Sequence, residues 1–275
     1  MYLAIMVHHG MRCNMPEGPE VETVIRSIKN KLINQKILDV NILYPAIASN
    51  DLVGIIGQVI KDIFRCGKFI IICLDKGYLL IHLRMEGKLL FSKEKLENKH
   101  VHCIFQLSND YMFYHDVRKF GRIGYYNCLE NSPVSKLGPD ALKITKEQLL
   151  ENIKNKSKAI KSVLLDQSVV AGIGNIYASE ICFVAKVNPF LPAKDINKDQ
   201  ALRLVNASHQ IIKKAIELGG SSIHTFYDSD GVSGRFQNEL LVYGKHNQKC
   251  PNCGSLIHKV KIDQRGSYYC ECCQK

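Results

Sequence analysis

The chain has 275 residues, and 37 lysines and arginines against 26 aspartates and glutamates give it a net charge of +11. This length fits one large domain or two ordinary ones. A hydrophobic content of 46% with 23% charged residues is typical of globular proteins and excludes a disordered tail or a fibre. The basic excess favours a polyanionic partner, because lysines and arginines that neutralise phosphates release counterions. A basic soluble protein without such a partner is the alternative.

Cysteine usage and hydropathy indicate a cytoplasmic protein without a membrane partner. Six of the eleven cysteines are scattered, at positions 13, 66, 73, 103, 128 and 182, as is usual in a reducing compartment. The apolar opening 1–7 lacks the basic segment and the cleavage pattern of a signal peptide. No run reaches the roughly 18 apolar residues that a membrane span requires.

The first half of the chain is predicted to form one helix followed by many short strands. Val21, Val24, Ile25, Ile28 and Leu32 lie at helical spacing, and acidic residues in the first turn suit the helix dipole. The following β-branched and aromatic runs are separated by Gly, Asp or Asn, and this pattern is typical of a sandwich or barrel. These runs cover residues 37–42, 59–64, 69–74, 78–83, 88–91, 102–107, 111–114 and 123–126.

After the prolines at 133 and 139 the apolar spacing becomes helical again, which predicts an α-helical domain. The helical positions are Leu149, Leu150, Ile153, Ile160, Val163, Leu164, residues 176–184, Leu202, Val205, Ile212 and Ile216. A polar, glycine-bearing stretch at 227–234 is predicted to be a long loop, and such loops are usually functional or disordered.

The strongest local motif is the C-terminal pair of Cys-x-x-Cys segments. Cys250 and Cys253 precede, and Cys270 and Cys273 follow, a stretch that is predicted to be a β-hairpin. Four thiolates at this spacing form a tetrahedral zinc site with no open position, so one structural Zn²⁺ is expected. A pair of disulfides is the alternative and conflicts with a reducing compartment. Cys272 is an extra thiol outside the predicted set.

Four further motifs, in order along the chain, resemble the formamidopyrimidine-DNA glycosylase family. They are Pro-Glu-Gly-Pro-Glu-Val-Glu-Thr at 16–23, His-Leu-Arg-Met-Glu-Gly at 82–87, Asp-Val-Arg-Lys-Phe-Gly at 116–121 and Gly-Ile-Gly-Asn-Ile-Tyr at 172–177. On residue types alone, the first motif is better explained as a proline-rich helix start.

The resemblance covers residue 15 to the C-terminus and implies an α+β fold in three parts. We expect a β-sandwich catalytic domain with a leading helix at 15–132, a helix-two-turn-helix DNA-binding domain at 133–245, and a zinc-finger hairpin at 246–275. Residues 1–14 would be a non-functional extension. The implied partner is duplex DNA containing oxidised bases, bound by a monomer.

The resemblance also implies a mechanism of base removal and strand cleavage. Pro16, once N-terminal, matches the nucleophile, and its secondary amine can form an iminium ion with C1′ of the damaged nucleotide. Glu17 matches the acid that protonates the sugar oxygen, and Glu20 a supporting carboxylate. Lys68 matches the proton donor for β-elimination, and Arg265 matches the arginine assigned to δ-elimination and to the phosphate beside the lesion.

A second implied group contacts the DNA. Met85, Arg118 and Phe120 match the residues that fill the space left by an everted nucleotide, although periodicity alone favours Met85 and Phe120 as core residues. His100, Lys156 and Asn175 match residues that contact DNA phosphates in the family. The segment 227–236 corresponds to a loop that closes over everted 8-oxoguanine.

Residues 1–14 conflict with this mechanism, because Pro16 has no free amine while a peptide bond precedes it. We expect translation to start at Met15, with proteolysis or an inactive full-length form as the alternatives. Two rival functions stay open. One is an endonuclease VIII-like glycosylase for oxidised pyrimidines, and the other is a catalytically silent, zinc-containing DNA-binding protein.

Overall fold

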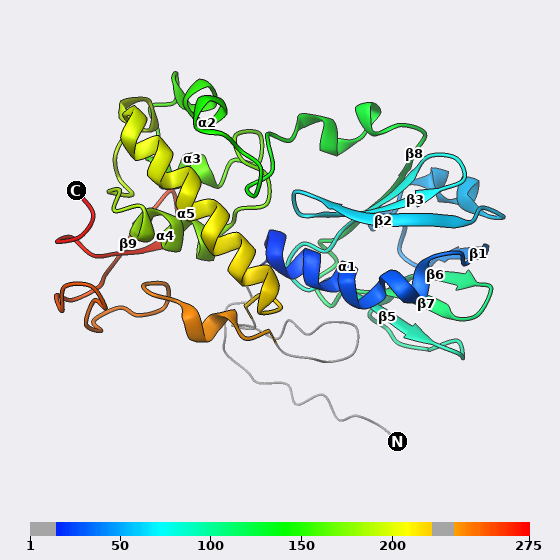
Figure 1. Ribbon diagram of the computed structural model, residues 1–275. Coiled ribbons are helices and arrows are strands. Elements are labelled where there is room, and N and C mark those ends of the chain that lie inside the picture. Colours follow the sequence, from blue (N-terminus) through cyan, green and yellow to red (C-terminus); the bar gives the residue numbers. More distant parts are fainter. Residues whose placement is uncertain (1–14, 222–233) are drawn as a thin grey trace.

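The computed structural model describes residues 15–221 and 234–275. Predictions for residues 1–14 and for all but the last three positions of 227–236 lie outside this part of the chain. The described residues form a β-rich half and a helical half, with the C-terminal hairpin beside the helices (Figure 1). None of the helices found in these ranges is long and apolar enough to cross a membrane.

Helix α1 (Gly18–Leu32) opens the described fold, as the sequence predicts. Pro19 lies in its first turn, where the missing N–H is not needed. Its apolar residues, from Val21 to Leu32, are buried in the core of the β-rich half. The backbone N–H of Gly18 donates to the carbonyl oxygen of Gly172 over 2.8 Å, so the start of α1 is attached to the helical half.

Two four-stranded antiparallel sheets form the β-sandwich, in the orders β1-β6-β7-β5 and β2-β3-β4-β8. Ile70 and Ile72 of β3 and Phe105 of β6 face the core between the sheets, whereas Ile71 and Val134 pack on the outer face. The strands are β1 (Ile37–Ile42), β2 (Ile60–Cys66), β3 (Phe69–Leu74), β4 (Tyr78–His82), β5 (Lys88–Ser92), β6 (Val101–Leu107), β7 (Tyr111–His115) and β8 (Arg122–Tyr126).

The helical half surrounds a second apolar core. It contains α2 (Lys146–Ile153), α3 (Ile160–Leu164), α4 (Asn175–Val184) and α5 (Lys198–Glu217). Thr145 caps α2 and Asn197 caps α5, each through a side-chain oxygen that accepts a backbone N–H. Helix α5 contacts both α4 and α1, so it packs the helical half against the start of the sandwich.

The C-terminal hairpin consists of β9 (His258–Ile262) and β10 (Arg265–Tyr269), and it packs on α4 through Phe183, Val242 and Ile257. Short 3₁₀ helices connect the main elements at Pro45–Ile47, Asn50–Ile55, Leu129–Asn131, Pro133–Lys136, Ala193–Asp195 and Phe236–Glu239. The expected α+β class, with a sandwich, a helical part and a four-cysteine hairpin, is confirmed.

Candidate active site

A small cavity of about 100 Å³ lies where the sandwich, the helical half and the hairpin meet. Pro16 is buried beside it, directly after Met15, which lines the wall. The cavity brings together four of the predicted site residues from distant parts of the chain, namely Glu17, Lys68, Asn175 and Arg265.

Glu17 is 3% exposed and lies against the N-terminus of α4. Its Oε1 accepts the backbone N–H of Ile176 over 2.9 Å, and its Oε2 accepts that of Tyr177 over 3.4 Å. Burial raises the pKa of this carboxyl to about 7, against the opposing charge of Lys68. A side chain at position 174 would overlap the Glu17 carboxyl, so the glycine in Gly-Ile-Gly-Asn is needed for this approach. Near neutral pH, Glu17 is therefore able to donate a proton.

Glu20 supports the same region from one turn into α1. Its Oε2 accepts the backbone N–H of Glu17 over 2.9 Å. Its Oε1 accepts the hydroxyl of Tyr177 over 2.6 Å and the backbone N–H of Ser221 over 2.7 Å. The carboxyl is buried, and burial raises its pKa. Glu20 thus connects the chain beside Pro16 both to α4 and to Ser221.

Lys68 lies in the β2–β3 turn and is only 5% exposed. Gly67 in this turn has φ 57°, a left-handed conformation that favours glycine. Burial lowers the pKa of the Lys68 ammonium, with the charge of Glu17 opposing this shift and that of Arg265 adding to it. An amine with a lowered pKa can exchange a proton at neutral pH more readily than a surface lysine.

Lys161 is a buried cation that the sequence reasoning missed. It is 1% exposed on α3 and donates to Asn175 Oδ1 over 2.7 Å, to Ser267 Oγ over 2.8 Å and to the Gly266 carbonyl oxygen over 3.4 Å. The Asn175 amide in turn donates to the Gly266 carbonyl oxygen over 3.1 Å. The signal was a lysine within the apolar run 159–165, where a solvated residue is not expected.

Lys156, which was predicted to contact a DNA phosphate, lines a neighbouring cavity of about 490 Å³. Arg265 lines this cavity as well. Its Nζ forms an ion pair with Asp166 over 3.0 Å. Lys156 is therefore near the predicted site but outside the cavity that holds Glu17 and Lys68.

The residues predicted to fill the space left by an everted nucleotide lie on two loops of the sandwich. Arg118 and Phe120 are exposed between β7 and β8, with the guanidinium 5.0 Å from the ring centre, and Met85 is half-buried between β4 and β5. Phe120 is 47% exposed, so it is not a core residue. His100 precedes β6, and its ring lies 5.7 Å from that of His115.

His82 is a second residue that sequence reasoning did not select, although it opens the motif His-Leu-Arg-Met. Its Nδ1 accepts the backbone N–H of Arg84 over 3.0 Å. Burial, together with the charges of Arg84 and Lys68, lowers the pKa of the imidazole to about 3. The ring is therefore neutral at physiological pH, and its proton resides on Nε2.

The four predicted zinc ligands converge in the hairpin. The sulfur atoms of Cys250, Cys253, Cys270 and Cys273 all lie within 4.8 Å of one another. Cys250 Sγ and Cys273 Sγ are 3.8 Å apart, and Cys253 Sγ and Cys270 Sγ are 3.4 Å apart. A tetrahedral zinc ion with Zn–S bonds of about 2.3 Å requires sulfur spacings of roughly 3.8 Å, so these residues fit the metal. Cys272 is exposed and outside the cluster.

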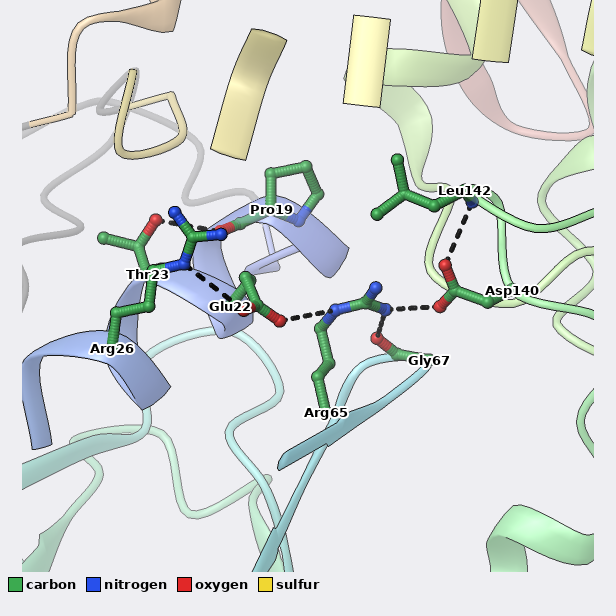
Figure 2. Close-up of polar contacts among 8 residues, drawn as sticks. All are labelled: Pro19, Glu22, Thr23, Arg26, Arg65, Gly67, Asp140 and Leu142. Carbon is green, nitrogen blue, oxygen red and sulfur yellow. Dashed lines mark hydrogen bonds and ion pairs between the residues drawn. The ribbon is translucent and has the colours of Figure 1, made fainter. Parts of the chain in front are cut away.

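Arg65 joins three segments of the chain (Figure 2). Its Nη1 donates to Asp140 Oδ2 over 2.7 Å and to the Gly67 carbonyl oxygen over 2.9 Å, and its Nε pairs with Glu22 over 3.4 Å. The side chain is 7% exposed. One guanidinium thus connects α1, the β2–β3 turn and the beginning of the helical half.

Comparison with known families gives three matches, in the order of the fold. The formamidopyrimidine-DNA glycosylase N-terminal domain matches residues 15–123, the formamidopyrimidine-DNA glycosylase H2TH domain matches 137–227, and a zinc finger found in FPG and IleRS matches 247–275. Together these three segments account for most of the chain.

Individual relatives agree with these matches. Formamidopyrimidine-DNA glycosylase of Listeria monocytogenes serotype 4b is 40% identical over 273 residues, with 95% of this chain and 100% of the relative covered. That of Streptococcus pyogenes serotype M6 is 41% identical over 275 residues, covering 95% and 99%.

Solved structures are similar as well. Lactococcus lactis Fpg (MutM) in complex with N7-benzyl-Fapy-dG DNA has a TM-score of 0.86 at 35% identity, covering 94% of this chain and 100% of that one. MutM (Fpg) from Thermus thermophilus has a TM-score of 0.85 at 33% identity, covering 94% and 98%. The chain belongs to the formamidopyrimidine-DNA glycosylase family.

Proposed function

We propose that the protein is a base-excision-repair enzyme that removes oxidised purines, chiefly 8-oxoguanine and formamidopyrimidines, from duplex DNA and then cleaves the strand. The observation that carries this proposal is the cavity in which a carboxyl of raised pKa and an ammonium of lowered pKa meet beside Pro16. Such a pair supplies an acid and a proton carrier at neutral pH next to an amine nucleophile.

In this mechanism the Pro16 nitrogen forms a bond to C1′ as the damaged base leaves with its electron pair. Glu17 gives a proton to the sugar ring oxygen, so the ring opens and an iminium ion remains on Pro16. Loss of the C2′ proton to a base expels the 3′ phosphate, and a second elimination expels the 5′ phosphate. Lys68 serves the first elimination and Arg265 the second, while water releases Pro16 from the sugar product.

The proposed DNA contacts rest on the family resemblance, and the exposure of Arg118 and Phe120 is compatible with them. Met85, Arg118 and Phe120 would fill the vacated stack and contact the orphaned base, ordinarily cytosine. His100, Asn175 and Arg265 would bind phosphates. We add Lys161 as a residue that positions Asn175, since its buried ammonium donates to the Asn175 side chain. Lys156 stays an outer phosphate contact beside Arg265.

Zinc holds the hairpin that carries Arg265. The hairpin has a small core of its own, so the metal bonds of Cys250, Cys253, Cys270 and Cys273 supply much of its stability. Its role is structural because four thiolates leave no open position on the metal.

We also propose domain boundaries at 15–132, 133–245 and 246–275, with the protein acting as a monomer in the cytoplasm, at the bacterial nucleoid. The family match that begins at residue 15 supports a functional chain that starts at Met15. Hydrolysis of the Met15–Pro16 bond by an aminopeptidase would then expose the amine of Pro16. Residues 1–14 would then play no part in the reaction.

Borohydride trapping on DNA containing 8-oxoguanine opposite cytosine tests the proposal. Protein begun at Met15, with this methionine removed, should become covalently attached to the DNA, and Pro16→Gly should greatly reduce this product. The same protein retaining residues 1–14 should give no adduct, because Pro16 then lacks a free amine. Binding without any adduct from the Met15 form would favour the silent DNA-binding alternative.

Lesion preference needs a separate comparison. Excision of 8-oxoguanine should exceed excision of thymine glycol from otherwise identical duplexes. Equal or faster removal of thymine glycol would favour the endonuclease VIII-like alternative, which uses the same nucleophile.

A further inference from the structure

A buried carboxylate binds both ends of the loop that carries Arg118 and Phe120. Residues 117–120 are all exposed, whereas Asp116 before them and Gly121 after them are buried. Asp116 is 0% exposed. Its Oδ1 accepts the backbone N–H of Arg118 over 2.9 Å, and its Oδ2 accepts that of Gly121 over 2.8 Å. One side chain therefore closes both ends of the exposed loop.

The backbone of Asp116 is fixed as well. Its N–H donates to the His100 carbonyl oxygen over 2.9 Å. Its own carbonyl oxygen lies 2.7 Å from His102 Nε2, and since a carbonyl oxygen only accepts, the imidazole is the donor. These two bonds attach Asp116 to β6 and so restrict the movement of the loop relative to the sheet.

A second clamp acts on the outer side of the same loop. Arg122 Nη1 donates to the Gly121 carbonyl oxygen over 2.6 Å and to that of Phe120 over 3.1 Å. Lys119 has φ 59°, a left-handed conformation that a free loop would rarely populate without a glycine. The bonds from Asp116 and Arg122 offset the cost of this conformation.

Asp116 and the neighbouring Tyr114 also support the loop that carries Met85. The buried Tyr114 hydroxyl lies 3.5 Å from Asp116 Oδ2. A side chain at position 87 or 121 would overlap this hydroxyl, so both glycines pack directly against it. The two loops that carry the candidate filling residues therefore rest on one Tyr114–Asp116 unit.

We propose that Asp116 is a positioning residue that presets the Arg118–Phe120 loop for entry into the duplex in place of the everted nucleotide. This inference rests on the proposed function and extends it. Because the loop is ordered before DNA arrives, binding does not have to supply the free energy of ordering it. Asp116 touches neither the sugar nor the base, so its effect should appear only where a stack has to be filled.

Two substrates separate this role from a general structural one. Duplex DNA with 8-oxoguanine opposite cytosine requires filling of the stack, whereas a single-stranded oligonucleotide with an abasic site has no orphaned base. In Asp116→Asn the new amide group faces a backbone N–H, so at least one of the two bonds is lost. We expect kcat/KM on the duplex to fall about tenfold or more, with borohydride trapping on the single strand changed less than about twofold.

Controls keep the outcomes distinct. Asp110→Asn, at the opposite end of β7 beside Lys93, should leave both activities unchanged. If Asp116→Asn does not fold, Arg122→Gln tests the same loop from its exposed side and should show the same selective loss. In binding experiments with 2-aminopurine as the orphaned base, the fluorescence rise at saturation should be smaller for these variants than for wild type.

Equal losses on both substrates, or an undiminished duplex reaction, would overturn the inference. Failure of the proposed function is a different result, since wild-type protein begun at Met15 would then trap on neither substrate.

Discussion

Replacement of Lys161 by methionine should show by how much a buried cation at this position lowers the unfolding free energy of the protein. The ammonium is buried among neutral acceptors, namely Asn175 Oδ1, Ser267 Oγ and the Gly266 carbonyl oxygen. Burial lowers its pKa from 10.5 to about 8, while Glu17 opposes the shift and Arg265 adds to it. Methionine has a similar length and fills the same space without a charge.

The pKa shift sets the size and the sign of the effect. A shift from 10.5 to about 8 corresponds to about 3 kcal/mol of unfolding free energy. Between these pH values the unfolded chain binds a proton at Lys161 that the folded chain does not, so wild-type stability rises with pH. The contribution is fully present above pH 10.5 and is lost as the pH falls through 8. Lys161→Met removes this dependence.

Urea unfolding at intervals from pH 7 to pH 10.5 measures the difference between the two proteins. Across this range the unfolding free energy of the wild type should rise by about 3 kcal/mol relative to that of Lys161→Met. At pH 7 the variant should be no less stable than the wild type. Lys156→Met is a matched control for loss of a lysine, since that side chain is 36% exposed. If the unfolding free energies of wild type and Lys161→Met changed with pH in parallel, the reasoning would be refuted. The variant should also bind lesion DNA more weakly, because Asn175 loses the partner that orients its amide.

Other parts of the molecule carry three further predictions. Cys253→Ser should lower zinc stoichiometry and weaken DNA binding, and Cys272→Ser should change neither; full metal content in Cys253→Ser would contradict the four-thiolate site. Glu180→Gln should lower the unfolding free energy by about 2 kcal/mol, because the buried carboxylate accepts three consecutive backbone N–H groups at 241–243, and an unchanged urea midpoint would argue against this. Arg65→Met should cost about 2 kcal/mol and show coupling with Asp140→Asn in a double-mutant cycle, whereas additive effects would mean that the pair in Figure 2 contributes little.

Periodicity was sufficient for most of the secondary structure. The helical spacing from Val21 to Leu32 predicts α1, and the short β-branched and aromatic runs predict all eight strands of the sandwich to within two residues at each end. The pattern fails at the end of β2, which continues through Arg65 and Cys66. These residues pair with Ile70 and Phe69 across the turn, and backbone pairing of this kind leaves no mark on hydropathy.

The candidate site was predictable where a motif is local and not where burial depends on distant segments. Glu17 and the four cysteines belong to short, recognisable motifs. Lys161 does not, because its importance comes from Ser267 and Gly266, more than 100 residues later in the chain. His82 was missed for a similar reason, since its neutral state reflects burial and the nearby charges of Lys68 and Arg84.

The contact between Glu17 and the start of α4 has a consequence for synthesis of the protein. The carboxylate emerges early from the ribosome, but its partners Ile176 and Tyr177 follow about 160 residues later, and Arg265 follows later still. Until the last hairpin has folded, the proposed catalytic residues Glu17 and Arg265 cannot line one cavity. We therefore expect a truncated or stalled product that lacks the hairpin to leave DNA uncleaved.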